Sequence, residues 1–443
     1  MSKQLNEEVQ KLFSGFSKLN KKERYQKLVE MGALDSSDVE YLQKKEPVSF
    51  DLAEKFIENV IGYFHMPMGV VTNFIIDEKP YVIPMAVEET SIIAAASKTA
   101  KWVKENGYIK TEVIGQEIIG QIQIPKVKNY EFLSAKLAEN KQNLIDQANV
   151  EVAAGLVRRG GGVTDIKLRP IERPDGGMMA VIHVMANTCE AMGANIINQV
   201  TEFLKPIIQQ MTGEELGMCI LSNLVDTKVT RATVVLKNIN TELGKSIEEG
   251  SLFSQIDPYR AATNNKGVLN GIDPILIATG NDWRAVEAGI HAYASRTGQY
   301  TSITKWTYNE DTSELTGVFE APIVVGTVGG VTKLHPTAQL SLKMMGIESS
   351  NELSQVCAAV GLVQNLGAIK ALTTVGIIEG HMKLHIQNLT LGAGAEEREI
   401  PIVQKKLEEI LKLKKRISLS HAIEVLKELR SSHKVTTQHN EVR

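Results

Sequence analysis

Residues 110–223 constrain the fold most, because strand-like and helix-like segments follow one another there in a distinctive order. Strands are indicated by short or alternating apolar runs, and helices by apolar residues three and four positions apart. The predicted elements are a strand at 118–124, a helix at 130–149, strands at 163–171 and 178–185 around a Pro-Asp-Gly turn, a helix at 191–211 and a strand at 216–221. This order is that of a ferredoxin-like unit inserted in a longer chain.

The remaining sequence is too long for a single core, since 443 residues exceed what one hydrophobic core organises. We predict an α+β fold in three parts: a large mixed α/β domain (residues 1–109 and 222–375), the ferredoxin-like insert (110–221) and a small helical C-terminal domain (376–443). The elements expected in the large domain are an N-terminal helical lead-in up to about residue 32, a helix at 50–61, strands within 66–87, a helix at 90–106 and a small-residue helix at 354–373.

The C-terminal tail differs from the rest of the chain in how its apolar and charged residues are spaced. Val403, Leu407 and Leu411, and then Ala422 and Val425, mark two amphipathic helices in a lysine- and glutamate-rich setting. We therefore expect a small mobile module at this end of the chain.

Composition excludes several classes of protein. A formal net charge of -3 gives no support to nucleic-acid binding. The polar start MSKQLNEEVQKLF does not resemble a secretory signal, and we expect no apolar run near the roughly 20 residues of a membrane span. The three cysteines, Cys189, Cys219 and Cys357, are far apart, so they predict neither a disulfide framework nor a zinc ribbon. A soluble protein of a reducing cytoplasm fits this pattern.

Four polar residues are candidates for chemistry, although each has an ordinary structural explanation. Glu89 fits the N-terminus of a helix, where the dipole favours negative charge. Asp282 fits an N-cap position. Lys266 lies in what we expect to be a polar loop, and His381 fits a surface or helix-terminal position. Taken singly, none of them identifies an active site.

Two further kinds of site receive little support. His381 and His385 are four residues apart and share a helix face, but no third ligand accompanies them, so metal binding is disfavoured. The cysteines resemble small buried hydrophobic residues, which leaves an acyl-enzyme mechanism without an obvious nucleophile.

Glycines mark two candidate sites for a nucleotide. The ordinary GxGxxG dinucleotide fingerprint is missing. However, the segment GLVRRGGGVTD carries consecutive glycines at 160–162, and EAMGAN places Gly193 at the start of a helix, where free N–H groups can bind phosphate. Their occurrence on separate connections of one ferredoxin-like unit favours a nucleotide site there.

Several separated motifs resemble the 3-hydroxy-3-methylglutaryl-coenzyme A (HMG-CoA) reductases, and in particular their soluble bacterial class (class II). The motifs occur in the order of the family. They are ENVIG (58–62), PMAVEETSIIAAAS (84–97), EAMGAN (190–195), DPYRAATNNKG, NGIDP and ATGNDWRAVEAG (within 257–289), VGTVGG (325–330) and GHMKLH (380–385).

The resemblance implies a large domain that binds the acyl-coenzyme A substrate and forms a homodimer through ENVIG, an insert that binds NAD(P)H, and a C-terminal flap. It also implies site residues. The catalytic set is Glu89, Lys266, Asp282 and His381; the substrate contacts are Ser91, Asn223, Arg260 and Asn270; the cofactor contacts are Asp165, Glu190, Met192, Gly193 and Asn195. The partners implied are HMG-CoA, mevalonate and coenzyme A.

The chemistry of thioester reduction explains these residue types. Two hydride transfers each place negative charge on the former carbonyl oxygen, which Lys266 can stabilise and Glu89 can protonate. Asp282 can hold the lysine in its charged form. The departing thiolate needs a proton, which His381 can supply near neutral pH. Closure of the flap would bring this acid to the site.

Two positions bear on the cofactor. Glu190 stands where the family commonly has aspartate, so its carboxylate reaches further by one methylene. Asp165 corresponds to a position near the adenosine ribose, where a carboxylate disfavours a 2′-phosphate. This favours NADH over NADPH.

Three alternatives remain open at this point. The same protein could oxidise mevalonate for catabolism, and an acyltransferase would need an activated cysteine or serine. A nucleotide- or acyl-CoA-binding protein that has lost the reaction is the non-enzymatic alternative.

Overall fold

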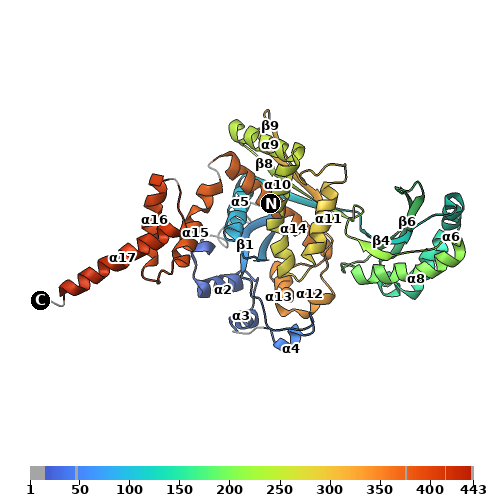
Figure 1. Ribbon diagram of the computed structural model, residues 1–443, viewed down its shortest axis with the longest axis horizontal. Helices are drawn as coiled ribbons and strands as arrows, with labels where there is room; N and C mark the ends of the chain where they lie inside the picture. Colours follow the sequence, from blue (N-terminus) through green and yellow to red (C-terminus); the bar gives the residue numbers. More distant parts are fainter. Residues whose placement is uncertain (1–14, 45–47, 375–376, 415, 441–443) are drawn as a thin grey trace. The chain divides into compact units, whose positions relative to one another are not determined.

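A computed structural model describes residues 15–44, 48–374, 377–414 and 416–440, without the side chains of 377–384 and 432–440. The chain divides into two compact units. The first contains the residues up to Glu88 and Ile92–Ile369, and the second contains Glu89–Ser91 together with the chain from Lys370 onward (Figure 1).

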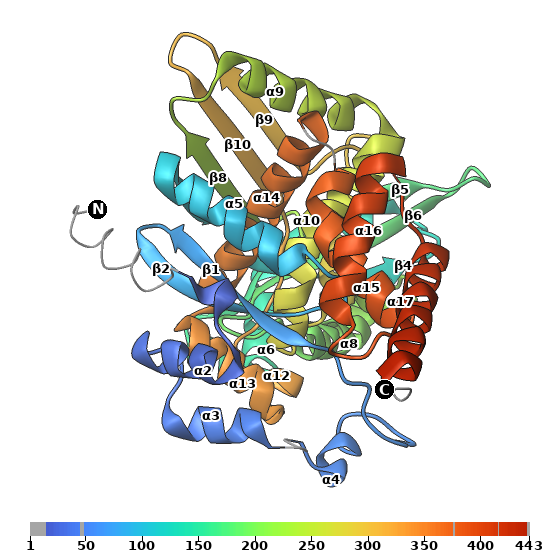
Figure 2. The same cartoon turned by 90° about the vertical axis from the view of Figure 1, so that its left-hand side faces the viewer.

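Two antiparallel elements form the sheet framework of the large domain. The hairpin pairs β1 (Met68–Ile76) with β2 (Lys79–Ala86), as the sequence predicts. The four-stranded sheet has the order β3-β8-β10-β9, and α9 packs along β9 (Figure 2). Its elements are β3 (Gly107–Ile114), β8 (Val229–Leu236), β9 (Thr304–Asn309), β10 (Glu314–Ala321) and α9 (Thr241–Ile256).

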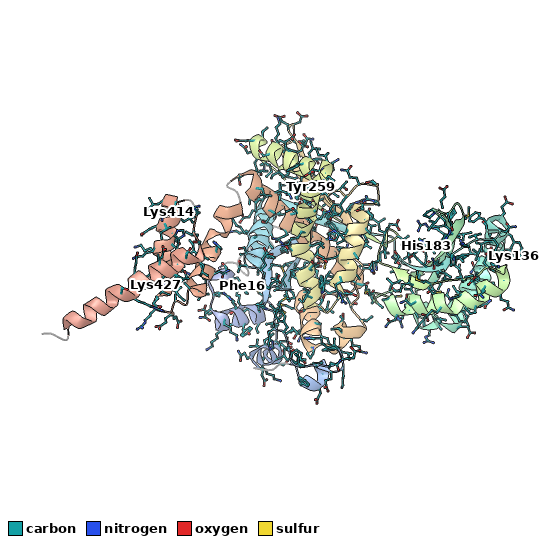
Figure 3. All side chains as sticks on the ribbon, in the orientation of Figure 1. Phe16, Lys136, His183, Tyr259, Lys414 and Lys427 are labelled. Atoms are coloured by element: carbon teal, nitrogen blue, oxygen red, sulfur yellow. The ribbon has the colours of Figure 1, made fainter. Side chains whose placement is uncertain are left out.

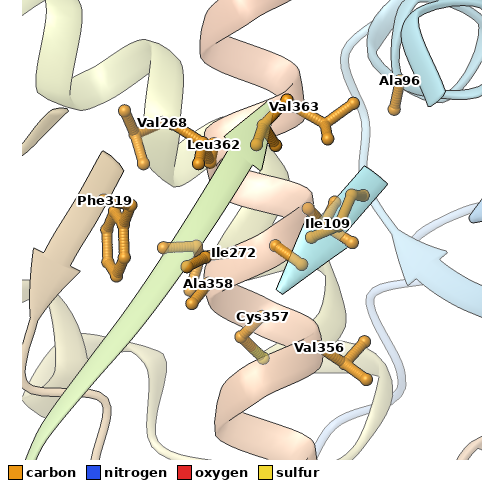
Figure 4. Packing of buried hydrophobic residues seen from close by; sticks show 14 of the residues in the cluster. Ala96, Ile109, Val268, Ile272, Phe319, Val356, Cys357, Ala358, Leu362 and Val363 are labelled. Carbon is orange, nitrogen blue, oxygen red and sulfur yellow. The ribbon is translucent and has the colours of Figure 1, made fainter. Parts of the chain in front are cut away.

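Helices complete the large domain. They are α5 (Ile92–Asn106), α10 (Pro258–Ala278), α11 (Trp283–Ala294), α12 (Gly330–Leu334), α13 (Pro336–Met345) and α14 (Ser350–Thr373). The main core contains apolar residues of β1, β2, the four-stranded sheet, α10 and α14. Figure 4 shows Val268 and Ile272 of α10 near Ala358 and Leu362 of α14.

Helices α10 and α14 cross closely at two glycines. A Cβ atom on Gly271 would lie 2.9 Å from the carbonyl oxygen of Val360, and one on Gly361 would lie 2.9 Å from the side chain of Ile272. The backbones can approach this closely because neither glycine has a side chain. This crossing explains why both helices are rich in small residues.

Helix α14 overturns the expectation that no segment is long and apolar enough to cross a membrane. By length and composition it qualifies, but 67% of its most apolar window is buried inside the protein. A central core helix passes the same test, because it too must be apolar on every side. The burial of α14 is that of a core helix.

The insert has the predicted ferredoxin-like topology. Its sheet has the order β5-β6-β4-β7, with α6 and α8 packed beside each other, α8 on β4 and α6 on β5. The elements are β4 (Glu117–Ile124), α6 (Tyr130–Glu151), α7 (Ala154–Val157), β5 (Gly162–Glu172), β6 (Met178–Asn187), α8 (Ala194–Thr212) and β7 (Cys219–Ser222). Strand β3 pairs with β8 in the sheet of the large domain.

The N-terminal region is helical in short pieces. These are η1 (Phe16–Lys18), α2 (Lys21–Glu30), α3 (Ser36–Gln43) and α4 (Phe50–Ala53). The helix predicted at 50–61 is therefore wrong beyond its first turn. Asn59 and Gly62 adopt φ values of 56° and 157°, which are not helical.

The second unit contains three helices in its described part: α15 (Ile377–Gly392), α16 (Ile400–Lys414) and α17 (Leu419–Asn440). Val403 and Leu407 of α16 pack against Ala422, Val425 and Leu426 of α17 in a small core of their own. The two amphipathic helices predicted for the tail are confirmed.

Candidate functional site

Lys266 lies in the middle of a helix, so the expectation that it lies in a polar loop is wrong. Helix α10 begins at Pro258, and the N-cap Asp257 accepts a hydrogen bond from the backbone N–H of Arg260 at 2.9 Å. Lys266 is exposed, whereas Asn264 and Asn265 before it are buried. The exposed lysine is thus held by a turn whose other side faces the core.

Buried amides fix this turn from one side. Asn264 Nδ2 donates to Ser302 Oγ at 2.7 Å and to Thr304 Oγ1 at 3.1 Å. Its Oδ1 accepts from Asn365 Nδ2 of α14 at 2.8 Å, and Asn365 Oδ1 in turn accepts from Trp306 Nε1 at 2.8 Å. Because these groups are buried, each hydrogen bond offsets the cost of removing its polar atoms from water. If α10 shifted along its axis relative to α14, these atoms would lose their partners and the cost would remain.

A second set of bonds holds the neighbouring residue. Asn265 Nδ2 donates to Tyr300 OH at 3.0 Å and to the carbonyl of Thr301 at 2.9 Å, while Asn265 Oδ1 accepts from the N–H of Ile303. The ring nitrogen Nδ1 of His291 in α11 lies 2.7 Å from Tyr300 OH. The helix that carries Lys266 is therefore tied to α11, α14 and the segment before β9.

Asp282 is the N-cap of α11, as its position in the sequence indicates. Its Oδ1 accepts from the N–H of Ala285 at 3.2 Å, and Arg284 lies 3.4 Å from the same oxygen. The preceding residue, Asn281, accepts from the N–H of Gly326 at 2.8 Å. This last bond joins the motif ATGND to the motif VGTVGG.

The motif EAMGAN contacts VGTVGG as well. The carbonyl of Glu190 accepts from the N–H of Thr327 at 2.9 Å, and its carboxylate accepts from the N–H of Ser350, the first residue of α14. A Cβ atom on Gly326 would lie 2.7 Å from the N–H nitrogen of Met192. Three motifs that are distant in the sequence thus meet where the insert joins the large domain.

A pocket opens at this junction, between the start of α8 and α11. Its lining is mostly apolar and includes Met192, Asn223 and Gly289. The other lining residues are Ile118, Ile119, Ala194, Ile197, Leu221, Ser222, Val225, Ala285, Val286, Pro322 and Val324. A cofactor contact and a substrate contact implied by the family resemblance therefore share one hollow.

Helix α8 presents its N-terminus to this pocket. Gly193 is the N-cap at φ 95°, and no side chain caps the helix. A Cβ atom on Gly193 would lie 2.4 Å from Thr188 and 2.7 Å from Ile118, so only glycine fits. Asn195 is exposed in the first turn of the helix. Uncapped N–H groups at this end can receive an anionic group.

Asp165 lies apart from this junction, on β5. Its carboxylate contacts Lys141 and lies 3.5 Å from Lys167. The pKa of Asp165 is lowered because hydrogen bonds and both lysine charges outweigh partial burial. Asp165 is therefore ionised near neutral pH, with two cations beside it.

The remaining predicted residues occupy several elements. Arg260 is in the first turn of α10, where burial lowers its pKa, and Asn270 lies one helical turn after Lys266. Glu89 and Ser91 join β2 to α5 and group with the second unit. Ser91 has φ 78°, and its buried Oγ has no hydrogen-bond partner in the described part of the chain. His381 is in α15, but its side chain lies outside the described residues.

Comparisons with known proteins agree with these motifs. The family model described as hydroxymethylglutaryl-coenzyme A reductase matches residues 20–386. The chain is 41% identical over 422 residues to the 3-hydroxy-3-methylglutaryl-coenzyme A reductase of Archaeoglobus fulgidus, with 94% of each chain covered. The chain belongs to the HMG-CoA reductase family.

Other members of the family are also similar. The probable HMG-CoA reductase of Borreliella burgdorferi is 34% identical, with 86% of each chain covered. A structure of the Streptococcus pneumoniae HMG-CoA reductase has a TM-score of 0.80 and 37% identity, covering 94% of this chain and 99% of that one. Another, of the class II enzyme from the same organism bound to NADPH, has a TM-score of 0.79 and covers 82% and 100%. As a family member the chain is an oxidoreductase of the mevalonate pathway.

Sequence reasoning missed two carboxyl groups of this HMG-CoA reductase fold. Asp273 follows Lys266 by seven residues on α10, and its buried Oδ1 has no hydrogen-bond partner in the described part of the chain, while Glu287 lies on α11. Burial and the charge of Glu287 raise the pKa of Asp273 to about 8, although Lys266 acts in the opposite direction. A carboxylate within the apolar run from Leu269 to Ile275 was the signal available in the sequence.

The cysteines and histidines add no further centre to this family member. Cys357 is fully buried and burial raises the pKa of its thiol, but Cys189 and Cys219 are only partly buried, so the expectation that all three are buried is wrong for two of them. Among the described residues, no group of three His, Cys, Asp or Glu is placed to hold a metal ion.

Proposed function

We propose that this family member reduces the thioester of HMG-CoA to mevalonate and free coenzyme A, using two molecules of a reduced nicotinamide cofactor. The observation that carries the proposal is that hydrogen bonds join EAMGAN, ATGND and VGTVGG to one another where the insert meets the large domain, close to the uncapped start of α8. A hydride donor and an acyl acceptor must lie against each other, and this junction joins the predicted cofactor insert to the predicted substrate domain.

The residues at the junction fit a nicotinamide dinucleotide. The free N–H groups of α8 suit its pyrophosphate, and the apolar side chains around Met192 are of the kind that packs against an uncharged ring. We assign cofactor contacts to Glu190, Met192, Gly193, Asn195 and, further along the insert, Asp165. When bound, the cofactor would supply hydride.

Asp165 is the residue on which cofactor choice would depend. Its ionised carboxylate would repel a 2′-phosphate, which favours NADH, whereas Lys141 and Lys167 partly compensate that charge. The Streptococcus pneumoniae relative has been described bound to NADPH. We keep NADH as the preferred cofactor of the proposal and NADPH as the alternative for the assay below.

The protein residues would manage charge and protons on the substrate. Lys266 would stabilise the negative charge that develops on the thioester oxygen, and Glu89 would protonate that oxygen. Asp282 would hold the lysine, while His381 would protonate the departing thiolate. Ser91, Asn223, Arg260 and Asn270 would bind the hydroxymethylglutaryl group. A C-terminal flap, residues 376–443, would exclude water during the reaction.

We further propose a cytoplasmic homodimer with its active site at the subunit interface. The segment containing ENVIG exposes Ile57, Ile61 and Phe64 at 63%, 100% and 90%, and Tyr259 of α10 is 88% exposed (Figure 3). Large apolar side chains exposed next to one another in the sequence favour burial by another chain. The burial of α14 within the chain supports a protein without a membrane span.

The test follows cofactor absorbance in the purified protein with HMG-CoA, with NADH and NADPH in parallel. We expect substrate-dependent oxidation, with one mevalonate formed for each two cofactor molecules. Replacing Lys266 by Ala should lower kcat by about 10³-fold without preventing HMG-CoA binding. Absence of turnover with both cofactors in folded protein would refute the proposal and favour a binding protein.

A further inference from the structure

The first turn of α14 takes one of its hydrogen-bond partners from the insert. Ser349 is the N-cap, since its Oγ accepts from the N–H of Glu352 and its carbonyl from the N–H of Leu353, both at 3.1 Å. Ser350 is the first helical residue. The N–H of such a residue has no acceptor within its own helix. Here it donates to Oε2 of Glu190 in the motif EAMGAN.

The start of α14 is buried, so this hydrogen bond has no ready substitute. Ser350 is only 2% exposed, and a buried backbone N–H without an acceptor is costly. Glu190 Oε2 also accepts from Thr327 Oγ1 at 3.4 Å. The hydroxyl of Ser350 donates to the carbonyl of Cys189 at 3.2 Å. Two successive residues of the insert are therefore bonded to the start of α14.

The backbone of EAMGAN has an unusual conformation at this contact. Cys189, just before the motif, has φ 53°, a left-handed value that is uncommon for residues other than glycine. Such a conformation persists where the surrounding contacts fix it. The bonds to Ser350 on one side, and to Thr327 of VGTVGG on the other, are contacts of this kind. The motif then continues into Gly193, the uncapped start of α8.

The two oxygens of the Glu190 carboxylate differ in their partners. Oε2 has the bonds to Ser350 and Thr327, whereas Oε1 accepts no hydrogen bond in the part of the chain that the structure describes. Oε1 is thus left for the cofactor contact assigned to Glu190 above. The same side chain can bind the cofactor on one side and be held by α14 on the other.

We propose that Ser350 is a positioning residue for the cofactor: its N–H, donated to Glu190 Oε2, holds EAMGAN in the conformation that binds the nicotinamide dinucleotide. The inference rests on the proposed function, which places the cofactor at this motif. Ser350 acts through Glu190, so its effect on binding is indirect. Helix α14 suits this task, because its buried residues belong to the main core of the large domain.

Ser350→Pro tests the bond directly. It removes the donated N–H, yet proline is favoured at the first position of a helix, and the N-cap before it is already non-helical. Ser350→Ala keeps the N–H and loses only the hydroxyl. Ser36→Pro, at the first position of α3, is the matched control, because this residue is exposed and distant in the sequence from both motifs.

The measurement is the dissociation constant of NADH and of NADPH, followed by cofactor fluorescence without HMG-CoA. We expect a rise of about tenfold in Ser350→Pro, less than about threefold in Ser350→Ala and no change in Ser36→Pro. Binding by Ser350→Pro that equals the wild type would overturn the inference.

A double variant distinguishes positioning from a general loss of structure. In Glu190→Ala no carboxylate remains to accept the N–H, so adding Ser350→Pro should change cofactor binding by less than about twofold. Substitutions of residues that act through one another are non-additive in this way. If Ser350→Pro weakens binding equally with and without Glu190, its effect does not pass through this carboxylate and the inference is wrong.

Hydrogen exchange needs neither cofactor nor turnover. In Glu190→Asp the carboxylate is shorter by one methylene, so it should no longer reach the N–H of Ser350, whose exchange should quicken at least about tenfold. Glu202→Asp, an exposed acid on α8, is the control. Unchanged exchange in Glu190→Asp would contradict the inference.

The two proposals fail in different ways. If the wild type binds the cofactor and the variants behave as expected, but HMG-CoA is not reduced, the proposed function is wrong and the role of Ser350 remains. If the wild type reduces HMG-CoA while Ser350→Pro binds the cofactor normally, only the role of Ser350 is wrong. A wild type that binds neither cofactor would refute both.

Discussion

In the ferredoxin-like insert, apolar side chains fill the space between the sheet and α6 and α8, whereas the core around α10 and α14 also contains a chain of buried amides. Ile122 and Ile182 of the insert sheet are fully buried apolar residues. Asn264, Asn365 and Trp306 are as deeply buried, but each depends on a named partner.

This difference separates two ways of stabilising a site. Apolar contacts are not directional, so a core of this type tolerates changes that preserve volume. Hydrogen bonds between buried amides are directional and costly when broken, so they select one arrangement of the helices. The region that carries Lys266 uses the directional type, which suits a side chain that must be held in one place.

The largest effect should follow from breaking the amide chain. Asn365→Leu preserves approximate volume but leaves Trp306 Nε1 and Asn264 Oδ1 without their partners. Two unsatisfied buried groups should cost about 4 kcal/mol of stability. Calorimetric melting measures this loss, with Asn143→Leu on the exposed face of α6 as control. If Asn365→Leu and Asn143→Leu melted at the same temperature, the buried amides would not stabilise the core around α10 and α14.

A cavity in the insert should have a somewhat smaller effect. Ile182→Ala removes a fully buried side chain from β6 and should cost about 3 kcal/mol. Ile220→Ala, in the same sheet but 48% exposed, should cost much less. Hydrogen exchange should show faster opening in the insert and little change in α10. Faster exchange in both regions would mean that they unfold together.

A substitution at the start of α8, where the insert joins the large domain, should weaken cofactor binding. Gly193→Ala places a Cβ atom within 2.7 Å of Thr188 and Ile118 at φ 95°, so the start of α8 must shift. We expect the KM for the cofactor to rise about tenfold, which corresponds to about 1.4 kcal/mol, with little change for HMG-CoA. Gly213→Ala also has a positive φ but open space around it, and it should leave the cofactor KM unaltered. An equal rise in both variants would assign the effect to backbone strain alone.

The smallest effect on stability should follow from removing a surface ion pair outside both cores. Lys343 of α13 forms ion pairs with Asp35 and Asp38, at 2.6 and 2.8 Å, but the lysine and Asp35 are largely exposed. Solvent and salt screen such pairs, so Lys343→Met should barely change the melting temperature. A decrease as large as that of Asn365→Leu would show that the N-terminal helices depend on this contact.

The insert was predictable because its signals are local. Apolar residues at helical and strand spacing indicated α6, β5, β6 and α8, and the turn around Asp175 fixed the hairpin between the two strands. Helix α10 was not predictable in the same way. Asn264, Asn265 and Gly267 are weak helix formers, so the segment resembled a loop. Their helical state depends on partners 35 to 101 residues away.

The sequence alone determined the family and the order of elements in the insert, because motifs and periodicity are properties of neighbouring positions. The catalytic residues that the family resemblance implies stay a prediction. Only the tertiary structure decided that Lys266 is on a helix and that three distant motifs meet where the insert joins the large domain. These facts arise from contacts between distant segments. Burial makes such contacts specific, since buried polar groups require partners that the local sequence does not name.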